Sequence, residues 1–517
     1  METQRDVKDL ARGAIWNYLG MLARLSKVLF MFVAARYYGA EALGIYFLAW
    51  NTINIVSKIG LMGMDRSIIR DINRYRSKDS EQNRDLIFAI LKYNIGLALL
   101  VSLVISVCLN FLSPWIANII FKNSGLILPL RVFSFVLPLV VLTQVFVATT
   151  KAQRIMVYDV LILHTLEPLI LLVGTLAFIP FRPGPMGLII AHVTASFCAL
   201  SVAIFVTRRF YGYLGWRHSS LEKEAKKETL RYATPIAAMD VLNLLAARMD
   251  ILLVGALINS TAAGYYGIAV EIISIIKRIR QGFEPIFAPI VSELYYKKER
   301  NRLKRNYTLV TRWLMTGSFL PVIATILFAR ELLSLFHVYS SDAAAALMVL
   351  ALAHGVFGSF SAAENILVMT GRSFLNMKLA LMTVIINGVV AILLIPKLGL
   401  VGASLGMLAA FLMVSIARIY QGFQQLHIHP FSSALFWPLV TATSTFVVFL
   451  LIKQHFNIHS TAGILFVLFP LCIFYALMFF LGGTEPEEKL LLSTLKKKIF
   501  RKHDSSPPKV PVNEIEE

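Results

Sequence analysis

The 517-residue chain is 57% hydrophobic and only 15% charged, which excludes an ordinary soluble protein, because soluble domains are about 45–50% apolar and about 25% charged. Its formal net charge of +20 would indicate nucleic-acid binding in a soluble protein, but most basic residues here lie in alternate loops between apolar stretches. The charge therefore reports membrane topology, and we expect no nucleic-acid partner.

About fourteen apolar stretches predict transmembrane helices, because about 20 residues of α-helix cross the roughly 30 Å hydrocarbon core of a bilayer. We therefore expect an all-α integral membrane protein without a soluble catalytic domain. In chain order, the predicted helices span residues 13–35, 41–63, 86–111, 127–149, 160–179, 186–207, 232–257, 263–291, 313–329, 345–369, 377–395, 400–421, 432–452 and 461–482.

The connections between these helices alternate in charge. On one side, together with the two chain ends, they hold clusters such as Arg66, Arg70 and Arg74. The positive-inside rule places that side, and both termini, in the cytoplasm. The opposite, outer side has only single basic residues, which are Arg36, Lys122, Arg182, Arg330, Lys397 and Lys453.

A weak internal repeat divides the chain. The sequence ALGIY at residues 42–46 returns as AAGYY at residues 262–266, about 220 residues later. Matching halves in one orientation are typical of transporters, with the substrate path between them. We therefore predict two repeated six-helix bundles around a central cavity, at residues 1–220 and 221–430, two additional transmembrane helices at 431–482, and a cytoplasmic tail at 483–517.

The tail begins with a capping-box pattern, Thr484-x-x-Glu487, and continues to three lysines at 496–498. This pattern predicts an interfacial amphipathic helix on anionic membrane lipids, followed by a disordered end.

Charged residues far from either membrane surface are the main functional signal, because each costs at least about 2.5–3.5 kcal/mol on insertion scales. The cations among them outnumber the acids, and an excess of cations in a water-filled cavity favours an anionic substrate, with guanidinium groups suited to phosphate oxygens. The candidate substrate-binding cations are Arg24, Lys27, Lys58, Arg248, Lys277, Arg278 and Arg280. The acids Asp240, Asp250 and Glu271 are candidates to take a coupling Na+ or H+.

The alternative is that these charges pair with one another as contacts between helices, for example Glu271 with Arg278, or Asp250 with Arg248. Four residues within about two turns of helix ends, Lys58, Arg131, Glu364 and Arg418, are expected to reach toward the membrane surface, although Lys58 also shares a helical face with Asn51 and Asn54 that could line the cavity. His192 fits either a proton relay or a hydrogen bond between helices.

Enzyme and metal motifs give no support to catalysis. The sequence has no G-x-x-x-x-G-K-[ST] phosphate loop, no H-E-x-x-H motif and no nucleophile elbow. The three cysteines are far apart, so we expect no metal site and no cofactor beyond a coupling ion. Transport, if it occurs, is driven by a gradient.

Residues 34–46, AARYYGAEALGIY, with Gly60-Leu61-Met62-Gly63 beyond them, resemble the first hairpin of Wzx-like oligosaccharide flippases, in the superfamily that also contains the MATE exporters and the lipid II flippase MurJ. The similarity extends over residues 10–425, with further matches at 370–372 and 395–403. It implies a V-shaped pair of bundles that moves a polyprenyl-pyrophosphate-linked oligosaccharide across a bacterial or archaeal cytoplasmic membrane by alternating access, with polysaccharide assembly proteins as further partners.

In that family, cavity arginines and lysines are thought to engage the pyrophosphate, and Arg24, Lys27, Arg248 and Arg278 are the best candidates by depth. The two extra C-terminal helices match the MurJ count, so a lipid II substrate stays an alternative. A MATE-type drug antiporter would need buried carboxylates in excess. A major facilitator, or a membrane enzyme such as a polysaccharide polymerase, are weaker alternatives.

Overall fold

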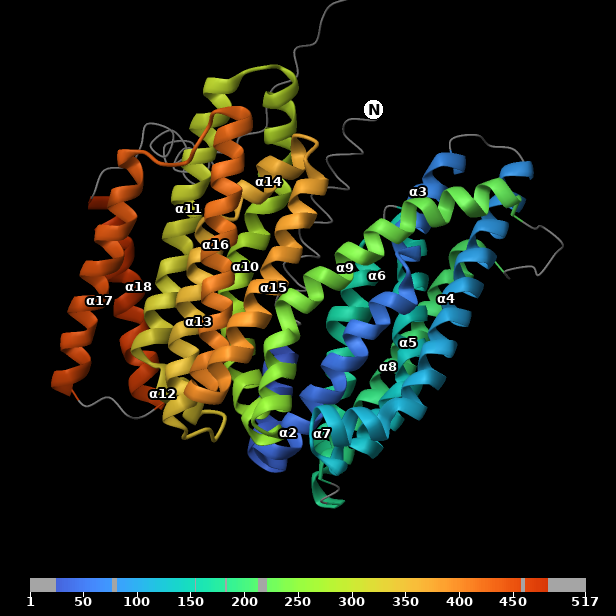
Figure 1. The fold of residues 1–517 in the computed structure, drawn as a ribbon, viewed down its shortest axis with the longest axis horizontal. Helices are drawn as coiled ribbons and strands as arrows, with labels where there is room; N and C mark the ends of the chain where they lie inside the picture. Colours follow the sequence, from blue (N-terminus) through green and yellow to red (C-terminus); the bar gives the residue numbers. More distant parts are fainter. Residues whose placement is uncertain are drawn as a thin grey trace, which may run out of the picture.

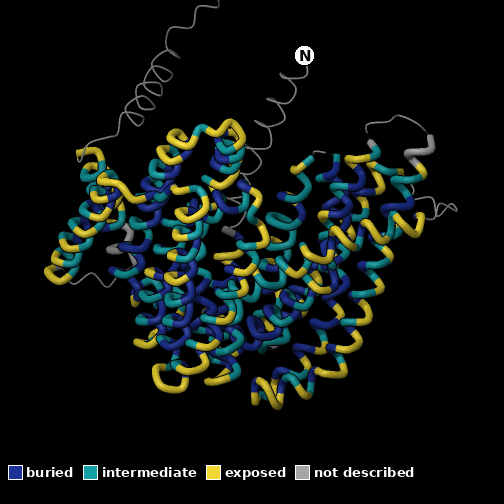
Figure 2. Tube along the Cα trace, turned by 45° about the horizontal axis from the view of Figure 1, so that its top comes forward, coloured by how far each residue is buried: buried dark blue, intermediate teal, exposed yellow. Residues whose placement is uncertain are grey.

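The computed structural model describes residues 25–76, 81–153, 155–181, 184–212, 221–456 and 461–481, and every structural statement below refers to these residues. Within them, all regular elements are helical. Ten stretches are long and apolar enough to cross a membrane, which confirms the predicted all-α membrane class. Figure 2 shows the buried residues gathered where helices meet. Exposed apolar side chains mark faces suited to lipid, as on one helix with Leu100, Val104 and Phe111.

The first half of the described chain forms one bundle of helices (Figure 1). Its elements are α2 (Leu25–Leu61), α3 (Met64–Arg76), α4 (Glu81–Trp115), η1 (Ile116–Ile120), η2 (Ser124–Leu126), α5 (Ile127–Ala152), α6 (Val157–Asp159), η3 (Val160–Leu166), α7 (Glu167–Phe178), η4 (Ile179–Phe181) and α8 (Pro185–Tyr211).

The second half forms the other bundle and an appended pair. Its elements are α9 (Lys223–Leu257), α10 (Ser260–Tyr296), α11 (Arg300–Leu327), α12 (Ala329–Ser334), α13 (Ser341–Ser359), α14 (Ala362–Met369), α15 (Ser373–Leu398), α16 (Leu400–Leu426), η5 (Ser433–Leu435), α17 (Phe436–Phe456) and α18 (Thr461–Leu481). Helix α9 runs diagonally between the bundles, and α17 packs on α11 at the outside of the second bundle.

The two bundles make a V in Figure 1. They meet near the middle of α2 and the start of α10, and they diverge toward the end of the molecule that holds α3 and the first turns of α9. That end also holds the basic connections, which the charge rule predicts to be cytoplasmic; the side of the membrane toward which the V opens stays a prediction. The bundle boundaries at residues 220 and 430 stay predictions, and the tail at 483–517 lies outside the described residues.

The predicted helix count of fourteen is not confirmed, and several boundaries differ. The break predicted between the first two helices is present: α2 holds two helical segments separated at Gly39, whose non-helical φ of 82° suits glycine. Residues 13–24 lie outside the described part of the chain. Helices α9 and α11 begin well before their apolar segments, at Lys223 and Arg300, because charged residues with good helix propensity continue the helix beyond the hydrocarbon. The predicted helix 345–369 is divided between α13 and α14.

The two repeated sequence segments lie against each other where the bundles meet. A Cβ atom on Gly44 of α2 would overlap the carbonyl oxygen of Ser260, and one on Gly264 of α10 would overlap the carbonyl oxygen of Ala40. Glycine at both positions lets the two backbones approach closely, as in tight membrane helix pairs. The amide Nδ2 of Asn123 donates a hydrogen bond of 2.7 Å to Ser260 Oγ beside this contact. The repeat therefore forms the closed end of the V.

Candidate functional site

A cavity of about 680 Å³ lies in the first bundle, beside α9. Its wall combines residues of α2, α3, α5 and α8 with the start of α7. The charged residues that line it are Lys58, Asp65, Arg66, Arg70, Lys151 and Glu167. Four of these are basic and two are acidic, so the cavity has a positive balance. Trp50 and Tyr232 add aromatic faces, which suits a ligand with both charged and apolar parts.

Lys58 is the cavity cation with a neutral partner. Its Nζ donates a hydrogen bond of 2.8 Å to the amide oxygen of Gln144; among the described residues no carboxylate lies within ion-pair distance of it, and Asp240 is within electrostatic range. Each of the other three lies near a carboxylate: Arg66 3.6 Å from Asp65, Arg70 2.6 Å from Asp71 and Lys151 2.8 Å from Asp159. Lys58 is therefore the cavity group best placed to meet an anion.

A second group of charges joins the two bundles. Glu271 of α10 lies 3.0 Å from Lys27 of α2 and 3.0 Å from Arg248 of α9. The carboxylate is 12% exposed, whereas Lys27 is 46% exposed. Lys277 lies within electrostatic range of the same carboxylate. Since one carboxylate serves at least two cations, this group also keeps a positive balance.

A third group lies inside the second bundle. Glu364 of α14 is 3.0 Å from Arg280 of α10 and 3.1 Å from Arg418 of α16. Both guanidinium groups lie over the ring of Phe357, at 5.2 and 5.5 Å from its centroid. The Arg418 side chain is 5% exposed, so Glu364 and Arg418 pair inside the bundle instead of reaching toward the membrane surface as the sequence predicted.

The predicted site residues therefore fall into separate places. Lys58 lies in the cavity, and Asp240 lies close enough for electrostatic interaction with Lys58 and Arg66. Asp250 accepts hydrogen bonds from the Tyr266 hydroxyl and the Ile251 amide, each at 3.0 Å. Arg278 is partly buried on α10 and takes no part in the three groups above. Arg24 lies outside the described residues.

Two of the three candidate acids have direct partners, but not the ones that the sequence suggested. Glu271 binds Lys27 and Arg248 rather than Arg278, and Asp250 binds Tyr266 rather than Arg248. The suggested pairs came from spacing along one helix or from adjacency in the chain. In the folded protein, side chains of neighbouring helices are closer.

Several cavity residues were not chosen from the sequence. Arg66 and Arg70 were assigned to a loop, but they lie on α3, a strongly amphipathic helix. Their spacing of four residues, continued by Arg74, is the signal that could have placed them on one helical face. Glu167 lies 3.8 Å from His192 Nε2, and His192 Nδ1 shares a 2.8 Å hydrogen bond with the Tyr46 hydroxyl.

This arrangement of two bundles around a gap that closes at one end is the fold of membrane transporters of the MOP superfamily. A MATE family multidrug resistance transporter in an inward-facing conformation superposes with a TM-score of 0.67 and 16% identity, covering 80% of this chain and 98% of the transporter. The lipid II flippase MurJ, in an inward closed conformation, superposes with a TM-score of 0.68 and 12% identity, covering 94% of this chain and 100% of the flippase.

The sequence family described as "Polysaccharide biosynthesis protein" matches residues 33–342. The chain belongs to this family, which confirms the resemblance to Wzx-like proteins and their superfamily. No curated protein sequence matches this chain. An outward-facing MATE family transporter superposes with a TM-score of only 0.56 at 16% identity, covering 81% of this chain and 96% of the transporter.

Proposed function

We propose that this protein is a flippase that moves a polyprenyl-pyrophosphate-linked oligosaccharide from the cytoplasmic to the outer leaflet of a bacterial or archaeal cytoplasmic membrane, for surface polysaccharide synthesis. The observation that supports the proposal most directly is Lys58, an ammonium whose hydrogen-bond partner is the neutral Gln144, in a cavity of about 680 Å³. A pyrophosphate gains charge-assisted hydrogen bonds there that a neutral lipid does not.

The cavity also separates the three parts of such a substrate. The pyrophosphate meets Lys58, with Arg66 and Arg70 nearby. The sugars occupy the polar space along the aromatic faces of Trp50 and Tyr232. The polyprenyl chain stays in the surrounding lipid, since transferring hydrocarbon into a polar cavity costs about 0.8 kcal/mol for each CH₂ group.

Alternating access requires the closed outer end to open and the cytoplasmic end to close. Lys27 lies on the first bundle and Glu271 on the second, so their ion pair is a contact that such a movement breaks. In the conformation seen here Glu271 is already held by two cations, and Asp250 by two hydrogen bonds. Of the three candidate coupling acids, Asp240 at the cavity is therefore the one we assign first to H+ or Na+.

A comparison of substrates tests the proposal. Purified protein in vesicles is supplied with one of three compounds: a polyprenyl-pyrophosphate-linked oligosaccharide, lipid II, or a cationic dye. Arrival of each lipid in the opposite leaflet is followed by its modification with an enzyme that cannot cross the membrane.

We expect the lipid-linked oligosaccharide to cross and the dye to be unaffected, because cations outnumber carboxylates in the cavity. Movement of lipid II alone would replace our proposal with the MurJ type of activity. Movement of the dye alone would replace it with MATE-type antiport.

A further inference from the structure

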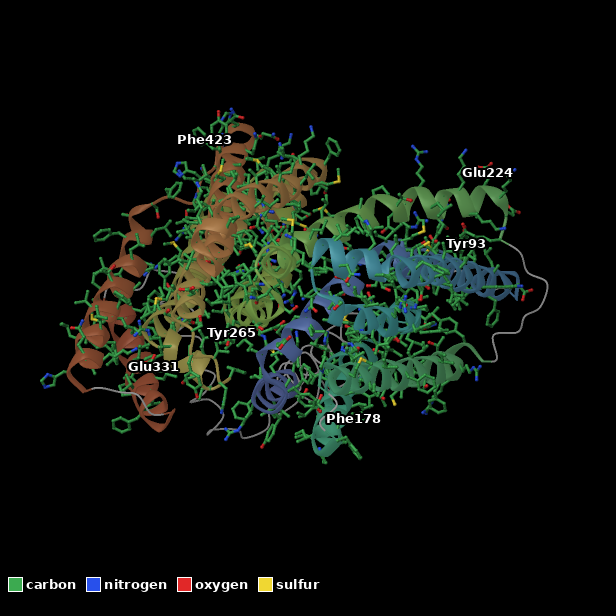
Figure 3. All side chains as sticks on the ribbon, turned by 60° about the horizontal axis from the view of Figure 1, so that its bottom comes forward. Tyr93, Phe178, Glu224, Tyr265, Glu331 and Phe423 are labelled. Atoms are coloured by element: carbon green, nitrogen blue, oxygen red, sulfur yellow. The ribbon has the colours of Figure 1, made fainter. Side chains whose placement is uncertain are left out.

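A second basic pocket lies at the closed end of the V. It has a volume of about 1000 Å³, and its wall comes from three separate parts of the chain: Phe32 and Arg36 of α2, residues 330–341 at and after α12, and Lys453 of α17. Figure 3 labels Glu331 in this region, beside the two appended helices. The first bundle, the second bundle and the appended pair therefore all contribute to it.

Half of the basic residues predicted for the outer side line this pocket. Only six such residues are predicted, and three of them are Arg36, Arg330 and Lys453. They come from loops that are far apart along the chain. Their gathering does not follow from membrane insertion, which requires only that outer loops have few basic residues.

The charges in the pocket are not balanced. Lys453 lies 2.7 Å from the Glu331 carboxylate and also donates a hydrogen bond to the Leu327 carbonyl oxygen. Glu331 is 8% exposed, so this pair fixes α17 to the second bundle. Among the described residues, neither Arg36 nor Arg330 forms an ion pair with a carboxylate. Two exposed guanidinium groups thus remain in the pocket without a counter-charge.

The surrounding groups suit a phosphate. Ser340 and Ser341 line the pocket with hydroxyl groups, whereas Ser334 donates its own to the Glu331 carbonyl oxygen; His337 and Tyr339 are exposed. Guanidinium groups bind phosphate oxygens through two parallel hydrogen bonds, and hydroxyl groups add further donors.

The depth of the pocket is that of lipid headgroups. Arg36 follows the first apolar segment, Arg330 follows the end of α11 at Leu327, and Lys453 is in the last turn of α17. Three helix ends on the same side of the molecule define the membrane surface there. A phosphate of a lipid in the outer leaflet is held at this level by its own acyl or prenyl chains.

We propose that this pocket binds the phosphate ester group of an outer-leaflet lipid. Two sources present this chemistry: the pyrophosphate of a translocated lipid-linked substrate, and the headgroup of an anionic phospholipid. The proposal does not rest on flipping activity. Because Arg36 belongs to α2 and Arg330 to the second bundle, a bound phosphate links the two bundles where the Phe32 and Phe336 rings also meet, with centroids 6.3 Å apart. Binding therefore favours the conformation that is closed at the outer end.

The test measures binding to the full-length protein in nanodiscs of phosphatidylcholine. The probes are geranyl pyrophosphate, which carries the substrate's charged group on a short prenyl chain, and phosphatidylglycerol, added in increasing fraction to the nanodisc. The double variant Arg36→Gln, Arg330→Gln is compared with wild type, and Lys122→Gln serves as the control, since Lys122 is a single outer basic residue outside this pocket.

We expect wild type and the control to bind at least one probe. The affinity of the double variant for that probe should be lower by at least about tenfold, because two charge-assisted contacts are lost. Binding of geranyl pyrophosphate alone assigns the site to the substrate, and binding of phosphatidylglycerol alone assigns it to phospholipid. Equal affinity in wild type and the double variant, or no binding of either probe to wild type, overturns the proposal. The Lys58→Ala variant tests the pocket independently of the proposed function. If the folded variant no longer flips the lipid but still binds the probe, binding in this pocket does not depend on flipping.

Discussion

The contact between the repeated segments makes a quantitative prediction about conformational equilibrium. In Gly264→Ala, the new Cβ overlaps the carbonyl oxygen of Ala40 and lies 3.1 Å from its carbonyl carbon and 3.2 Å from the amide nitrogen of Gly44. All of these are backbone atoms, so no side chain can move aside, and the two helices must separate. Overpacking of this kind costs about 1–3 kcal/mol.

That cost falls on the conformation closed at the outer end, because the contact exists only while the middle of α2 and the start of α10 meet. A coupling of about 1–3 kcal/mol shifts an equilibrium roughly 5- to 150-fold. We therefore expect Gly264→Ala to raise the population of the form open at the outer side by a factor in this range.

The assay uses a cysteine introduced at Ala263, which is fully buried beside the contact, in a chain whose three native cysteines are replaced. Labelling by a membrane-impermeant maleimide reports how often the outer end opens. Gly282→Ala is the matched control, because a Cβ at Gly282, on the same helix, meets nothing within 4 Å. Equal labelling rates for Gly264→Ala and the unsubstituted reporter, or an equal acceleration by Gly282→Ala, would refute the reasoning.

Two further predictions concern buried polar contacts. Glu271→Gln leaves Lys27 and Arg248 without their shared carboxylate. Losing one partner of a buried ion pair costs about 3–5 kcal/mol, and we expect the lower end because Lys27 is 46% exposed; an unchanged unfolding temperature in detergent would contradict this. Tyr46→Phe removes the 2.8 Å hydrogen bond to His192 Nδ1 in a fully buried setting, at a cost of about 1–3 kcal/mol. Tyr37→Phe, at a side chain that is 59% exposed, should leave the unfolding temperature unchanged, and an equal loss in both variants would count against a specific contact.

The membrane class and the family could be predicted from sequence because both depend on local patterns. Apolar segments near the bilayer thickness and the motif at residues 34–46 need no knowledge of helix packing. The helix boundaries were less accessible. The sequence predicted helices at 232–257 and 263–291, whereas α9 and α10 have 35 and 37 residues, because charged residues continue them beyond the apolar segments.

The site was predicted only in part, for a related reason. Lys58 was identified as a cation on the same helical face as Asn51 and Asn54, and it does line the cavity. The ion-pair partners of Glu271 were not predicted. Lys27 and Arg248 come from two other helices, and their proximity to Glu271 depends on how the bundles pack. The gathering of Arg36, Arg330 and Lys453 was hidden in the same way, since the three are separated by hundreds of residues in the chain.

The central claim is that Lys58, a cavity cation hydrogen-bonded to a neutral amide, engages the pyrophosphate of a lipid-linked oligosaccharide. The most direct test compares transport of that lipid by wild type, Lys58→Ala and Lys397→Ala in vesicles. Lys397 is an exposed lysine at the end of α15, away from the cavity lining. Because a charge-assisted hydrogen bond contributes about 1.5–3 kcal/mol, we predict at least a tenfold lower transport rate for Lys58→Ala and an unchanged rate for Lys397→Ala. Transport by folded Lys58→Ala at the wild-type rate would contradict the account.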